Sequence, residues 1–120
     1  MQVLVGLSCT GLALAAAAND ADRGRRLLTR DQCGSCHVIP GVAAATGRSA
    51  PTLAAFGRRS YIAGQWPNEG DTLVRWIIAP RSLVPDATMP VMGAGEVDAR
   101  DMAAYLPRLR LMEIGRSERV

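Results

Sequence analysis

The sequence predicts an all-α domain in which three to four short helices wrap around one covalently bound group. The chain has 120 residues, enough for one domain, and several segments carry apolar residues at helical spacings. We see no alternation of apolar and polar residues typical of a strand. The core has few large side chains to fill it, because the chain contains only two Trp, two Tyr and one Phe. A bound group would supply the missing apolar volume.

The first 18 residues are predicted to be an export signal. The apolar run from Val3 ends in small residues, which suit signal peptidase, and it is a little short of the roughly 20 residues of a membrane span. We expect cleavage near Ala18, with retention as an anchor as the alternative. Cys9 is interpreted as a small apolar residue of this run rather than as a lipid attachment site. The rest is expected in an oxidising, periplasmic compartment, as a domain over residues 19–107 and a tail over 108–120.

Helix ends are set by aspartate caps and prolines. Four segments are predicted to be helical: 21–30, 52–56, 72–79 and 99–106. Two segments rich in Gly, Pro and Ala are predicted to be loops, 38–51 and 81–96. We expect Asp71 and Asp98 to cap the third and fourth helices, Pro80 to end the third and Pro107 the fourth. On the first helix, Arg23, Arg26 and Arg30 form a stripe that is most simply a solvated face.

The motif that carries chemistry is Cys33-Gly34-Ser35-Cys36-His37, the C-x-x-C-H pattern of covalent haem attachment. Two thiols three positions apart project from about one helical turn and could each form a thioether, with the next imidazole on the iron. A thioredoxin-like dithiol would follow a strand, and a structural zinc site needs four ligands. The sequence therefore predicts one covalent haem c, with Cys33 and Cys36 as attachment points and His37 as an axial ligand.

The second axial ligand is predicted to be a methionine. The chain has one histidine and no lysine, which leaves methionine, water or an open position. Met89 lies in a loop stiffened by Pro85 and Pro90, and a rigid loop suits a weak thioether ligand; Met92 is the alternative. Closing both axial positions with His and Met favours electron transfer over catalysis.

These motifs resemble the class I bacterial cytochromes c, which carry one haem with His and Met ligands. The similarity covers about residues 21–106, in DRGRRLLTRDQCGSCHVIPGV, APTLAAFGRRSYIAG, LVRWIIAP followed by LVPDATMP, and DMAAYL. The resemblance implies a small cytochrome c fold and a hydrogen bond from the His37 ring to the carbonyl of Pro51. It also implies a close crossing of the first and last helices at Gly24 and Tyr105. The chain departs from the family at Ala50, where a glycine is common, and at Pro107.

Residues that could line the haem pocket or reach its propionates are also implied. They are Arg59, Tyr61, Trp66 and Trp76. Each of them could equally serve packing or surface charge.

The predicted function is one-electron transfer in a respiratory-type chain, by a protein that is not itself an enzyme. It would act free or as a cytochrome subunit of an oxidoreductase complex, with redox partners such as a membrane oxidase, a reductase or a dehydrogenase. The alternative is a haem-based sensor of small ligands or a peroxidase-like enzyme with an open sixth position. The net charge of +3 comes from dispersed arginines, which does not indicate nucleic-acid binding, and peripheral membrane association stays possible.

Overall fold

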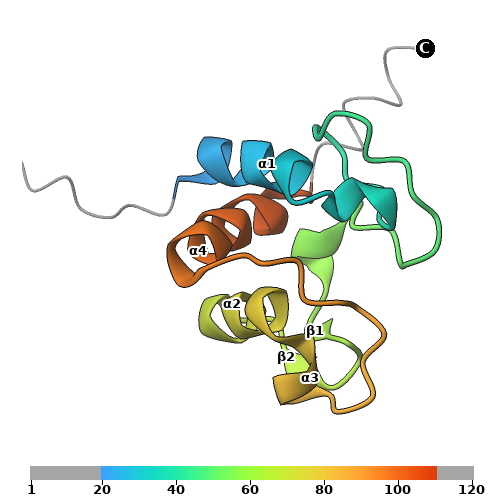
Figure 1. Cartoon of the computed structure of the whole chain (residues 1–120), viewed down its shortest axis with the longest axis vertical. Coiled ribbons are helices and arrows are strands. Elements are labelled where there is room, and N and C mark those ends of the chain that lie inside the picture. Colours follow the sequence, from blue (N-terminus) through green and yellow to red (C-terminus); the bar gives the residue numbers. More distant parts are fainter. Residues whose placement is uncertain (1–19, 111–120) are drawn as a thin grey trace, which may run out of the picture.

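The computed structural model describes residues 20–110, which fold around one buried cluster of apolar side chains. Figure 1 shows the elements within this range. In chain order they are α1 (Ala21–Arg30), η1 (Cys33–Ser35), η2 (Phe56–Arg58), β1 (Tyr61–Ile62), β2 (Trp66–Pro67), α2 (Gly70–Ile78), α3 (Pro80–Leu83), α4 (Glu96–Tyr105) and η3 (Leu106–Arg108), where η marks a 3₁₀ turn. The expected export signal and most of the expected tail lie outside the described residues.

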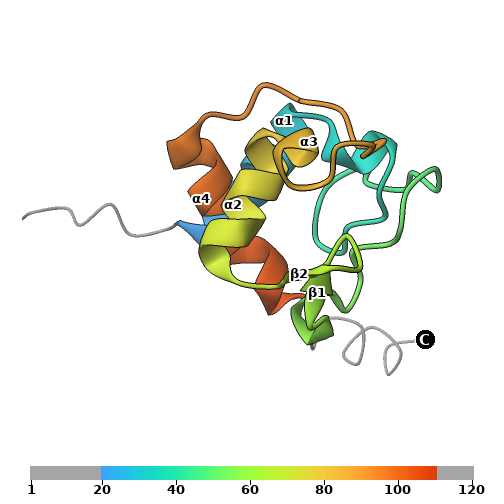
Figure 2. The same cartoon turned by 90° about the horizontal axis from the view of Figure 1, so that it is seen from below.

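The all-α prediction is wrong, because the described residues include a two-stranded antiparallel sheet beside the four α-helices. Tyr61 pairs with Pro67 and Ile62 with Trp66. Between the strands Ala63 and Gly64 have positive φ angles of 51° and 76°, which reverse the chain in the sense that strand twist favours. Figure 2 shows this hairpin below α3, and the indole of Trp66 donates to the carbonyl oxygen of Leu83 in that helix. Aromatic and β-branched residues on both sides of a glycine are the sequence signal for it.

Helix α1 has the predicted bounds, and it lies along α4 (Figure 1). Its N-cap is Asp20, whose carboxylate accepts the backbone N–H of Arg23 at 2.9 Å. Gly24 permits the close crossing of the two helices, since a Cβ there would lie 1.9 Å from the backbone oxygen of Asp101. The crossing glycine implied by the resemblance is therefore present. Tyr105 is buried and donates its hydroxyl to the carbonyl oxygen of Pro40 at 2.6 Å.

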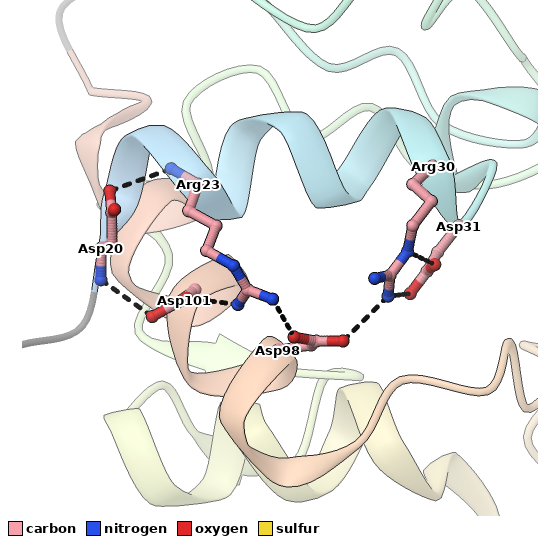
Figure 3. Close-up of polar contacts among 6 residues, drawn as sticks. All are labelled: Asp20, Arg23, Arg30, Asp31, Asp98 and Asp101. Atoms are coloured by element: carbon pink, nitrogen blue, oxygen red, sulfur yellow. Dashed lines mark hydrogen bonds and ion pairs between the residues drawn. The ribbon is translucent and has the colours of Figure 1, made fainter. Parts of the chain in front are cut away.

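The predicted solvated stripe on α1 is only partly solvated, because two of its arginines pair with α4. Arg23 binds Asp98 at 2.6 Å and Asp101 at 2.7 Å, and Arg30 binds Asp98 at 2.9 Å and Asp31 at 2.7 Å (Figure 3). We call these residues, with Asp20, the α1–α4 ion-pair cluster. Asp101 is buried and also accepts the backbone N–H of Asp20. The cluster fixes the two helices side by side.

The other helices differ from the prediction at their ends. Helix α2 begins at Gly70, so Asp71 lies in its first turn and is not its cap. Pro80 ends α2 as expected, but it also starts α3, because proline suits the first position of a helix. Helix α4 begins at Glu96, which places Asp98 inside the helix, where it can reach α1. The turn expected over residues 52–56 forms later, as η2.

The core lies between α1, α2 and α4, and the loops close it. Its least exposed large side chains are Ile39, Leu73, Met102, Leu109 and Pro80. Among residues 20–110, none of the helices has the length and apolar character that crossing a membrane requires.

Candidate functional site

The C-x-x-C-H motif follows α1 directly and forms one tight turn. Gln32 has a positive φ of 59°, which turns the chain out of α1 and into η1. The N–H groups of Cys36 and His37 both donate to the carbonyl oxygen of Cys33, at 3.3 and 3.1 Å. Cys33 is half-buried against the core and Cys36 is exposed. Both cysteines and the imidazole thus belong to a single turn of backbone.

A second segment, residues 47–53, runs beside this turn and holds its backbone. Three N–H groups of the segment donate to carbonyl oxygens of the motif and of the residue after it. The bonds run from Gly47 to Gly34 at 3.0 Å, from Ala50 to Cys36 at 3.1 Å and from Leu53 to Val38 at 2.8 Å. The approach is close, because a Cβ on Gly47 would lie 2.2 Å from the oxygen of Ser35. The turn is therefore positioned by hydrogen bonds outside the motif itself.

The His37 ring is oriented by the same segment. Its Nδ1 lies 2.6 Å from the carbonyl oxygen of Pro51, the contact that the resemblance implied. A carbonyl can only accept, so Nδ1–H donates, and in the neutral ring of this tautomer Nε2 carries the lone pair. Such a bond fixes the tautomer and the ring orientation of a metal-binding histidine. The His37 side chain is half-buried.

Burial raises the pKa of the Cys33 thiol above its usual range, and the nearby charge of Asp31 raises it further. The thiol form therefore predominates at neutral pH.

Met89 lies in the loop between α3 and α4, and side chains of neighbouring residues hold this loop by hydrogen bonds to its backbone. Met89 is half-buried, whereas Met92 is exposed. Arg81 donates to the carbonyl oxygen of Ala87 at 3.2 Å, two residues before Met89. The Trp66 indole donates to the carbonyl oxygen of Leu83 at 3.0 Å, where the loop begins. Within residues 20–110 no hydrogen bond joins Met89 to the C-x-x-C-H turn, so its role as a ligand stays a prediction.

The expected pocket residues lie in three different places. Arg59 donates to the carbonyl oxygen of Thr52, next to Pro51, and its guanidinium carbon lies 5.8 Å from the centre of the Phe56 ring. Tyr61 is 59% exposed, on β1. Trp76, on α2, is half-buried against the core. Of these three, only Arg59 is connected to the segment that holds His37. A pocket role for them, and for Trp66 at the Met89 loop, stays a prediction.

Comparisons with known proteins give two relatives. The chain is 35% identical to cytochrome c oxidase subunit 2 of Alkalihalophilus pseudofirmus over 94 residues, which are 78% of this chain and 27% of the relative. It is 30% identical to cytochrome c oxidase subunit 2 of Bacillus subtilis over 96 residues, 75% of this chain and 26% of the relative. The chain thus spans about a quarter of the length of these relatives. No family model and no solved structure matches.

These relatives support a cytochrome-related electron-transfer protein, and they correct two predictions. The expectation that the protein is not an enzyme is overturned, because both relatives are named as subunits of an oxidase, which is an enzyme. The prediction of one covalent haem c as the cofactor is overturned as well, since the relatives are identified as oxidase subunits and not as haem c proteins. The physical reason is that thiol, imidazole and thioether donors suit copper as well as haem iron. The motif therefore does not identify the bound group, and the assignment of Cys33, Cys36 and His37 to that group stays a prediction.

Proposed function

We propose that this chain is a one-electron carrier of a respiratory chain and works as part of a cytochrome c oxidase complex. Its similarity to two oxidase subunits supports the complex. The chemistry of the C-x-x-C-H turn supports the redox role. Docking to the complex would bring the electron to the oxidase.

The observation that carries the proposal is the oriented imidazole of His37. A histidine whose Nδ1–H is held by the Pro51 carbonyl, 2.6 Å away, offers Nε2 to a metal in a fixed direction. A fixed ligand reduces the structural change between the two oxidation states. In the chain, this imidazole follows Cys36 and shares its turn with Cys33. The three donors therefore fit one metal-containing group.

We assign His37 and Met89 as the metal ligands, with Cys33 and Cys36 as the residues that attach the group. The group supplies a metal that alternates between two oxidation states differing by one electron. The chain keeps the ligands in place through both states. Residues 47–53 do this for the histidine side, and the Arg81 and Trp66 hydrogen bonds do it for the loop of Met89. Arg59, Tyr61 and Trp76 are proposed to lie around the group.

The test is to isolate the chain from a respiring bacterial host and to measure its metal content, its spectrum and its reduction potential. Met89→Ala removes one ligand and is expected to shift the potential on the order of 0.1 V. Met92→Ala is the matched control, because it removes an exposed methionine three residues away, and its potential should not change. Metal analysis and electron paramagnetic resonance then identify the metal.

Three results would contradict the proposal. A chain that retains no redox metal after expression in a competent host would exclude the carrier function. Equal potentials for the Met89 and Met92 variants would remove Met89 from the ligand set, and binding of carbon monoxide by the unmodified reduced protein would indicate an open ligand position instead.

A further inference from the structure

Two short turns from distant parts of the chain meet on one side of the molecule. Turns η2 and η3 pack against each other through Gly57. A Cβ on Gly57 would lie 2.0 Å from the carbonyl oxygen of Pro107 and 2.3 Å from Cγ of Arg110. Only a residue without a side chain permits this contact. The contact brings the arginines at the end of η2 next to those at the end of η3.

Four arginines are gathered at this contact, and all four are exposed. We call Arg58, Arg59, Arg108 and Arg110 the η2–η3 arginine patch. Among residues 20–110, no ion pair involves any member of the patch, whereas Arg23, Arg30 and Arg100 all bind carboxylates. Four neighbouring positive charges without a carboxylate partner create a local positive potential. Such a surface attracts an anionic partner.

The patch is connected to the proposed redox site by a short route. Arg59 donates to the carbonyl oxygen of Thr52, and the preceding carbonyl, that of Pro51, accepts the hydrogen bond of the His37 ring. The carbonyl that binds Arg59 and the carbonyl that binds His37 thus belong to consecutive residues, Thr52 and Pro51. A protein bound at the patch would lie on the histidine side of the site.

We infer that the η2–η3 arginine patch is the docking surface for an acidic redox protein. The electron exchange between this partner and the chain rests on the function proposed above. A protein partner is favoured over a lipid surface by the residue types. The planar guanidinium of Arg matches a carboxylate with two hydrogen bonds, and Tyr61, exposed two residues beyond Arg59, belongs with Arg to the types enriched at protein interfaces. Among residues 20–110, the exposed apolar residues that could enter a membrane, Val91, Met92 and Val97, belong to other elements.

The test compares two variants of the full chain with equal net charge. One replaces Arg58, Arg108 and Arg110 by Gln and keeps Arg59, which is proposed to lie around the bound group. The control replaces three exposed arginines elsewhere, Arg26, Arg48 and Arg75. Binding to immobilised polyglutamate, the probe for an acidic protein surface, is measured at low and high salt. The patch variant should bind at least roughly tenfold more weakly than the control variant, and salt should abolish the difference.

Two outcomes would overturn the inference. Equal weakening of both variants would show that net charge alone binds the probe. Preferential binding of the unmodified chain to phosphatidylcholine vesicles with about one third phosphatidylglycerol, over polyglutamate, would assign the patch to a lipid surface instead.

Electron exchange separates this inference from the proposed function. Ferricyanide, an anionic oxidant, takes one electron from the reduced chain and becomes ferrocyanide, and we expect the patch variant to react more slowly than the control variant. If neither variant nor the parent chain reacts with ferricyanide, but the patch variant still binds polyglutamate more weakly than the control variant, the proposed redox function is wrong and the docking surface is retained. Equal rates for the two variants would overturn the docking of a redox partner at the patch.

Discussion

The α1–α4 crossing and the η2–η3 contact are built alike but differ in charge. At each, a glycine lets an early segment approach the backbone of a late one, Gly24 at Asp101 and Gly57 at Pro107. Beside Gly24 the arginines bind carboxylates of the opposite helix. Beside Gly57 the arginines have no such partner among the described residues. The arginines at the first contact pair with carboxylates of the chain and so stabilise the fold, whereas those at the second contact are available to bind another molecule.

The largest expected effect comes from filling the α1–α4 crossing. In Gly24→Ala the new methyl would lie 1.9 Å from the Asp101 oxygen, and relieving this overlap would require one helix backbone to move away from the other. We expect the free energy of unfolding to fall by about 3 kcal/mol, measured by chemical denaturation. Gly70→Ala is the matched control, because nothing lies within 4 Å of its Cβ position at the start of α2, and it should not destabilise. Equal losses in both variants would refute the close crossing.

Filling the η2–η3 contact should cost less. In Gly57→Ala the methyl would lie 2.0 Å from the Pro107 oxygen, but η3 is a single short turn and can shift more easily than α4. We expect a loss of about 2 kcal/mol in the same denaturation experiment. A loss larger than that of Gly24→Ala would reverse the proposed order of the two contacts.

What the sequence predicts well is local or contained in one motif. The bounds of α1 follow from apolar spacings within ten residues, and the C-x-x-C-H turn is read directly. The ion-pair partners of Arg23 cannot be predicted from local sequence, because Asp98 and Asp101 are 75 and 78 positions away. The hairpin escapes it as well, since strands of two residues are too short to show alternation.

The candidate site shows the same division. The predicted ligands Cys33, Cys36 and His37 stand out by residue type, and the resemblance pointed to Pro51. The supports of the Met89 loop do not stand out, because Arg81 and Trp66 bind the backbone carbonyls of Ala87 and Leu83, which every residue possesses. The identity of the bound group is not decided by the motif either, since several metals accept these donors.

The ion-pair cluster predicts a pH dependence of stability. Hydrogen bonds lower the pKa of the Asp98 and Asp101 carboxyls below their usual range. At Asp98 the donors are Arg30 and, with a smaller effect, Arg23; at Asp101 they are Arg23 and the backbone N–H of Asp20. The contribution of a lowered pKa is present above the unfolded value, about 3.9, and is lost as the pH falls through the folded value. Unfolding free energy should therefore decrease in acid below about pH 5, and Asp101→Asn should lose about 1 kcal/mol at pH 7 and flatten this decrease.

The control for this pH series is Asp86→Asn, which changes an exposed aspartate without an ion pair in the described structure. It should keep the parent slope. A slope in Asp101→Asn as steep as that of the parent chain would separate the acid sensitivity from the cluster.

The smallest effect on stability is expected where the arginines have no carboxylate partner. Replacing Arg58, Arg108 and Arg110 of the η2–η3 arginine patch by Gln should change the free energy of unfolding by less than about 1 kcal/mol, because it breaks no ion pair and relieves mutual repulsion. Replacing Arg23 and Arg30 by Gln should cost more, although fewer charges change, because Asp101 is buried and would lose its arginine partner. Both variants are compared by denaturation at low salt. If the patch variant proved the less stable of the two, its arginines would hold η2 against η3, and the surface would serve the fold in the same way as the α1–α4 crossing.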